Sequence, residues 1–144
     1  MKRAVLILLS LSVWATVVRA DGDRIWSALV LATKEDPEKP VPESLTEMAP
    51  VIQKVFGFTS LYLLGEKKRN LVSGGEEWLV PSREFFFKVQ CLSRRETAYN
   101  LRIELYRGEK LLLTTAVKLA RGAPLYIRGP RWGEGQLIFL FEVQ

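Results

Sequence analysis

The chain has 144 residues, of which 48% are hydrophobic and 26% charged, and its formal net charge is +5 at neutral pH. One cysteine and no histidine exclude Ser-His-Asp and Cys-His catalytic machinery, an ordinary zinc site and an intramolecular disulfide. Lys2, Arg3 and Arg19 are three of the 21 basic residues, so 18 remain against 16 acidic residues after position 20. This balance of +2 gives no case for nucleic-acid binding.

The first twenty residues are predicted to be a cleaved signal peptide. A short basic start precedes the apolar run Ala4–Val18, and modest or small residues then lead to a cleavage site after Ala20. The run is shorter than the ~20 residues that span a bilayer, which argues against the alternative of an uncleaved anchor. We therefore expect residues 1–20 to be removed. Residues 21–144 are then one exported domain, periplasmic or extracellular, without a transmembrane segment.

Three consecutive segments alternate apolar and polar side chains with a period of two, which predicts β-strands with one buried face: Glu84–Leu92, Ala98–Arg107 and Lys110–Leu119. On their polar face Phe86, Leu92 and Leu112 interrupt the pattern, which predicts either an exposed apolar patch or a second packing layer. Three further side chains in predicted strands are expected in the core: Trp26, Trp78 and Cys91.

Two other strands are apolar on both faces, Ile25–Thr33 and Gln136–Val143. A strand of this kind is buried on both sides, so we expect these two near each other in the middle of the sheet. Shorter strands are predicted at Phe58–Leu64, Asn70–Ser73, Glu76–Val80 and Leu125–Gly129. The charged run Lys67-Lys68-Arg69 is typical of a solvated tip or a protected strand edge.

One helix is predicted over Pro42–Phe56. Its apolar side chains recur at helical spacing and form one stripe, made of Leu45, Met48, Ile52, Val55 and Phe56. Gly57 is a natural C-terminal stop, whereas Pro50 predicts either a kink or a break into two short turns. The fold class is therefore α+β, with one amphipathic helix on a largely antiparallel sheet of about seven to nine strands, curled towards a sandwich or an open barrel.

The connection around Gly108-Glu109 has two interpretations. A two-residue hairpin pairs Leu105 with Leu112 and turns Leu112 inward. The apolar row Leu111, Leu113, Val117 and Leu119 requires the opposite phase, because a one-residue slip moves every side chain to the other face. We favour the apolar row and a three-residue loop.

Catalytic and cofactor motifs are absent from the sequence. It contains no phosphate-binding glycine motif and no nucleophile elbow. Glu76 and Glu77 are adjacent in a predicted strand, so they point to opposite faces and cannot act as a glycosidase pair. We therefore predict no catalytic residues, metal or cofactor, and a carboxylate-based hydrolase is the less favoured alternative.

The best candidate for a recognition surface is the segment Arg128–Gly135. It places Arg128, Arg131 and Trp132 in a glycine-rich loop, and Trp and Arg are the side chains that most often anchor interfaces. Such a loop would hold a protein partner or stack on a sugar ring. In the alternative interpretation, Trp132 folds back as a lid on the end of the sheet.

The run Leu31-Ala32-Thr33, then Leu45 and Val55-Phe56-Gly57-Phe58 leading into Leu61–Leu64, resembles small exported bacterial proteins of unknown function. The resemblance covers the first half of the mature chain, implies a strand–helix–strand start, and carries no site residues. We therefore expect a non-catalytic binding module of the bacterial cell envelope with a protein partner. The alternative is a domain that binds a carbohydrate or envelope polymer through the Arg128–Gly135 loop.

Overall fold

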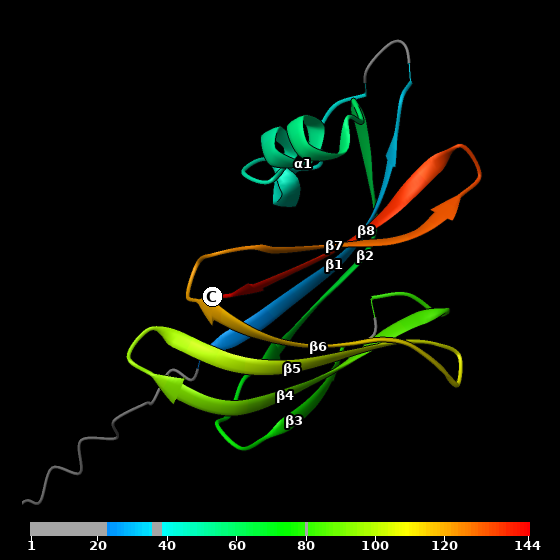
Figure 1. The fold of residues 1–144 in the computed structure, drawn as a ribbon. Coiled ribbons are helices and arrows are strands. Elements are labelled where there is room, and N and C mark those ends of the chain that lie inside the picture. The colour runs from blue at the N-terminus through cyan, green and yellow to red at the C-terminus, as the bar shows by residue number, and fades with distance from the viewer. Residues whose placement is uncertain (1–22, 36–38, 80) are drawn as a thin grey trace, which may run out of the picture.

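The computed structural model describes residues 23–35, 39–79 and 81–144, so the predicted signal peptide lies outside the described residues. In this part of the chain eight strands form two four-stranded sheets (Figure 1). Sheet A has the strand order β2-β1-β8-β7, and sheet B has the order β3-β4-β5-β6. The elements are β1 (Arg24–Thr33), η1 (Glu43–Leu45), α1 (Ala49–Phe56), β2 (Ser60–Asn70), β3 (Glu76–Leu79), β4 (Phe85–Arg95), β5 (Ala98–Arg107), β6 (Lys110–Ala120), β7 (Leu125–Trp132) and β8 (Gly135–Val143).

The two sheets pack face to face around the main core, and all their paired strands are antiparallel. Phe139 and Phe141 of β8 meet Phe85 and Phe87 of β4 edge to face, with ring centroids 4.4 to 5.5 Å apart. Cys91 belongs to this core, as predicted. The mostly antiparallel β-structure with one α-helix is therefore confirmed in outline, and the sheets form a sandwich rather than a closed barrel.

The predicted central position of the first and last strands is confirmed. β1 lies between β2 and β8, and β8 lies between β1 and β7. Both strands are buried on both faces because the opposite side of sheet A carries a second, smaller core. Trp26 and Ile138 belong to this second core, where they meet the helical segment, residues 43–56, which contains η1 and α1.

The predicted helix is broken into two short pieces. Residues 43–45 form the 3₁₀ turn η1, and α1 begins at Ala49, with Pro50 in its first turn, where a missing N–H costs little. Gly57 ends α1 in the left-handed region, at φ 74°, as predicted. Most of the predicted stripe faces sheet A, but Val55 is 65% exposed, so its assignment to the buried face is wrong.

The β5–β6 hairpin combines a two-residue turn with an inward-facing apolar row, which were predicted as alternatives. Gly108 and Glu109 form a two-residue turn between the paired Arg107 and Lys110, so the predicted three-residue loop is wrong. A β-bulge at Leu112 then shifts the register by one residue. The shift returns Leu113, Val117 and Leu119 to the core side, as predicted, but leaves Leu111 opposite Tyr106 and half exposed.

Strand β2 is longer than predicted and runs through the charged residues Lys67, Lys68 and Arg69. It pairs with β1 alone, so these charges lie on an edge strand, as one of the two interpretations proposed. The predicted strand Asn70–Ser73 is wrong, because residues 71–75 connect β2 to β3 outside both ladders.

Among the described helices, none has both the length and the apolar character needed to cross a membrane.

Candidate functional site

The segment Arg128–Gly135 is a β-hairpin rather than a long loop. Only Gly133 and Glu134 form the turn between β7 and β8, and Gly133 adopts a φ of 59°, which favours glycine. β7 contains one extra residue between Arg128 and Arg131, so the register shifts within the segment. The predicted glycine-rich loop is therefore replaced by a bulged strand, which fixes the direction of each side chain.

The structure does not bring the three predicted binding residues into one cluster. Arg128 lies over the Phe56 ring of the helical segment, 5.1 Å from its centroid, on the outer face of sheet A. Arg131 pairs with Gln136 and is exposed. Trp132 lies towards the opposite face, where its indole meets residues of the space between the two sheets.

Trp132 forms one wall of a small pocket at the end of the sandwich. The pocket has a volume of about 200 Å³, and its walls are mostly apolar side chains, from Leu29, Leu64, Phe85, Trp132 and Leu137. Trp132 is 42% exposed, so its indole both covers the end of the core and presents a free surface. Trp132 therefore packs against the end of the core, as the lid interpretation expects, while its role in recognition stays a prediction.

Charged side chains surround this Trp132 pocket. The Arg107 guanidinium lies 5.5 Å from the Phe85 ring centroid and 5.9 Å from that of Trp132. Its nitrogens are held by the Glu84 carboxylate, and Ser82, Arg83 and Glu84 line the pocket beside Phe85. An apolar centre surrounded by polar residues is the usual composition of a protein-binding hot spot.

A second aromatic surface lies on the solvent face of sheet B. Trp78, Phe86 and Tyr106 contact one another at centroid distances of 5.3 to 5.8 Å. Trp78 is 44% exposed, so its predicted place in the core is wrong. Of the three predicted interruptions of the polar face, Phe86 joins this cluster, whereas Leu92 and Leu112 are exposed individually.

Carboxylates on the same face are engaged by neighbouring charges. The Lys88 ammonium lies 3.4 Å from Glu76 and 3.7 Å from Glu104, and the Tyr106 hydroxyl donates to Glu104 over 2.8 Å. The hydrogen bond to Glu104 raises the pKa of Tyr106, and the one to Glu76 raises the pKa of Lys88. This network stabilises the charged state of Lys88, and its hydrogen bond is made with Glu76. Such pairing of charges is expected on the solvated face of sheet B.

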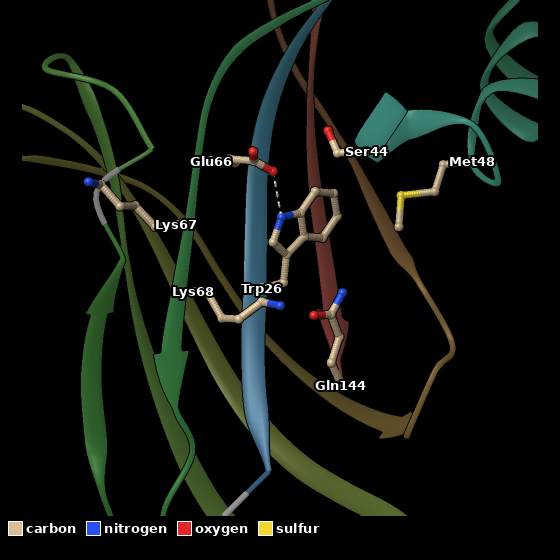
Figure 2. Close-up of a pocket in the computed structure, with 7 residues that line it drawn as sticks. All are labelled: Trp26, Ser44, Met48, Glu66, Lys67, Lys68 and Gln144. Atoms are coloured by element: carbon tan, nitrogen blue, oxygen red, sulfur yellow. Dashed lines mark hydrogen bonds between the residues drawn. The ribbon is translucent and has the colours of Figure 1, made fainter. Parts of the chain in front are cut away.

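A second pocket, of about 470 Å³, lies between sheet A and the helical segment (Figure 2). Its residues come from four separated parts of the chain: Trp26, Ser44, Met48, Glu66, Lys68 and Gln144. The indole N–H of Trp26 donates to Glu66 over 2.9 Å, and Trp26 is only 5% exposed. Lys67 also contributes to the lining, but its amino group points away from Trp26 (Figure 2), whereas Lys68 pairs with Trp26 across the β1–β2 ladder and so lies on the same face of sheet A.

Glu142 lies beside this Trp26 pocket and pairs with Trp26 across the β1–β8 ladder. Burial raises the pKa of Glu142, and the charge of Glu47 adds to the rise, while a hydrogen bond from Gln144 and the charge of Lys68 oppose it. Sequence periodicity alone could not identify this pocket, because its donors and acceptors meet only where β1, β2, β8 and the segment around η1 converge.

In the described residues, His, Cys, Asp and Glu side chains do not gather in groups of three that could hold a metal ion. Cys91 is buried, and burial raises the pKa of its thiol, so it is a poor nucleophile. Comparison with protein-family models, curated proteins and solved structures finds no match to this chain.

Proposed function

We propose that this protein is a non-catalytic binding module of the bacterial cell envelope that holds a protein partner at the Trp132 pocket. The observation that carries the proposal is a half-exposed tryptophan at the mouth of an apolar pocket. Trp side chains are over-represented among the residues that dominate binding energy, and these residues lie in well-packed pockets of the interface.

The size and lining of the pocket favour a protein side chain as the ligand. About 200 Å³ is below the usual range for small-molecule sites, but it suits one large apolar side chain of a partner. Arg107 and Glu84 at the rim supply one positive and one negative group, which can meet polar groups of the partner around the inserted side chain. A sugar held between Trp132 and flanking arginines has less support, because Arg128 lies on the other face of sheet A.

The test is crosslinking in cells, followed by mass spectrometry, with the wild type beside Trp132→Ala. We expect specific protein partners that are lost in the variant. Trp78→Ala is the matched control, because Trp78 is also a strand tryptophan and its exposure, 44%, is close to the 42% of Trp132.

Loss of the partner in Trp132→Ala together with retention in Trp78→Ala supports the proposal. If Trp78→Ala alone abolishes the crosslink, the binding surface is the face of sheet B and the Trp132 proposal is wrong. Recovery of the wild type without any crosslinked partner also contradicts it.

A further inference from the structure

We propose that the Trp26 pocket is a binding site for a neutral saccharide. This site is separate from the Trp132 pocket, and the inference does not depend on the function proposed above. It rests on the size of the pocket, on the chemistry of its walls and on the ligand classes that those walls disfavour.

The size of the Trp26 pocket suits a small molecule. Its volume of about 470 Å³ falls within the 300–1,000 Å³ that is usual for ligand sites. Strands β1 and β2 form its floor, and Ser44 and Met48 close one side from the helical segment (Figure 2). β1 is hydrogen-bonded to strands on both sides in sheet A, so the floor is built on regular sheet structure.

The walls offer hydrogen-bond donors and acceptors together. Lys68 has three ammonium donors, and within the described residues it forms no ion pair. Glu66 receives the indole N–H on one carboxylate oxygen, which leaves the other oxygen as an acceptor. Ser44 and Gln144 each supply both functions. Neighbouring sugar hydroxyls also donate and accept, so this mixture matches them.

The remaining lining is apolar. Trp26 and Met48 line the pocket, but each is only 5% exposed, so they contribute the edges of a packed apolar wall rather than an open stacking face. The indole N–H of Trp26 is already taken by Glu66. These apolar edges suit contact with C–H groups of a sugar, while its hydroxyls face Lys68 and Glu66.

Charge disfavours the other classes of small ligand. An anion would face Glu66 in the wall, with Glu142 and Glu47 close by. The attraction to Lys68 would have to exceed the repulsion from these three carboxylates. A cation would face Lys68 directly. The described residues offer no group of three ligands for a metal ion. A neutral polyol avoids each of these costs.

The experiment is calorimetric titration of the exported protein with a panel of neutral hexose and N-acetylhexosamine mono- and disaccharides. Choline and glutamate serve as charged probes. We expect saturable binding of at least one saccharide. In Lys68→Ala the binding should weaken about tenfold, the effect of losing one hydrogen bond to a charged group. Lys110→Ala is the matched control, because it removes the same charge from an exposed lysine of sheet B that does not line the pocket.

Circular dichroism and thermal unfolding establish that both variants fold, as expected for exposed side chains. Saccharide binding that is weakened by Lys68→Ala and unchanged by Lys110→Ala supports the inference. Absence of binding to every saccharide in the panel at millimolar concentration overturns it. Equal effects of the two substitutions, or binding of choline or glutamate alone, overturn it as well.

Discussion

The buried amide of Gln136 is predicted to hold the β7–β8 hairpin, and with it Trp132, in place. The register shift in β7 leaves backbone carbonyls outside the regular ladder. The Gln136 amide nitrogen contacts the carbonyl oxygens of Gly129, Leu137 and Pro130, the last two at 3.0 and 3.3 Å. Gln136 is 6% exposed, so water has little access to replace it.

The cost of Gln136→Ala follows from the hydrogens available. An amide NH₂ group has two N–H donors, so two of the three contacts are full hydrogen bonds at one time. At ~1 kcal/mol each these contribute about 2 kcal/mol, and one carbonyl left buried without a donor adds ~1 kcal/mol. We therefore expect the free energy of unfolding to fall by about 2–3 kcal/mol, which lowers Tm by roughly 10 °C in a domain of this size.

Urea unfolding, followed by circular dichroism, measures this change. Gln90→Ala is the control, because Gln90 lies on the solvent face of sheet B, and its substitution should alter stability by less than ~0.5 kcal/mol. If Gln136→Ala also costs less than ~0.5 kcal/mol, the carbonyls of the bulge are satisfied without the amide and the reasoning fails. Weaker partner binding by the folded Gln136→Ala variant would show that the same amide positions Trp132.

Three further predictions concern groups that are buried or partly buried. Asp23 is 4% exposed and pairs with Arg94 at 3.2 Å and Arg121 at 3.3 Å, so Asp23→Asn should lower the free energy of unfolding by about 1–3 kcal/mol. A cost below ~0.3 kcal/mol in urea unfolding would contradict this ion-pair role. Because burial raises the pKa of the Cys91 thiol, we expect a thiol reagent to label Cys91 after unfolding but not in the native protein, and rapid native labelling would contradict its burial. The raised pKa of Glu142 means that the folded state favours the protonated carboxyl, so stability should decrease as pH rises from 4.5 through the folded pKa. Glu142→Gln should therefore be more stable than the wild type at pH 7, and this advantage should disappear at acidic pH, as thermal unfolding across pH would show.

Local patterns in the sequence determined the elements and their buried faces. The period-two alternation in residues 84–119 predicted three strands, and the two strands that are apolar on both faces predicted the centre of sheet A. Pro50 and Gly57 predicted where the helix breaks and ends. These features follow from the sequence because backbone dihedrals and side-chain direction depend on residues close together in the chain.

Tertiary structure decided what long-range packing controls. Arg128 and Trp132 are four residues apart, so an unbroken strand would place them on the same face, and the extra residue of the bulge separates them. A second bulge, at Leu112, allows a two-residue turn while keeping the apolar row inside. In both cases the bulge turns a large apolar side chain, Trp132 in β7 and Leu113 in β6, towards the space between the sheets.

Both pockets also depend on contacts that span the chain. The Trp26 pocket joins residues 26, 44, 48, 66, 68 and 144, and the Trp132 pocket joins both sheets at one end of the sandwich. Sequence spacing identified Trp132 as a candidate because its residue type and its glycine neighbours are local features. It could not identify Glu66 and Lys68, since their meeting with Ser44 and Gln144 is determined by strand order and by the helical segment packing on sheet A.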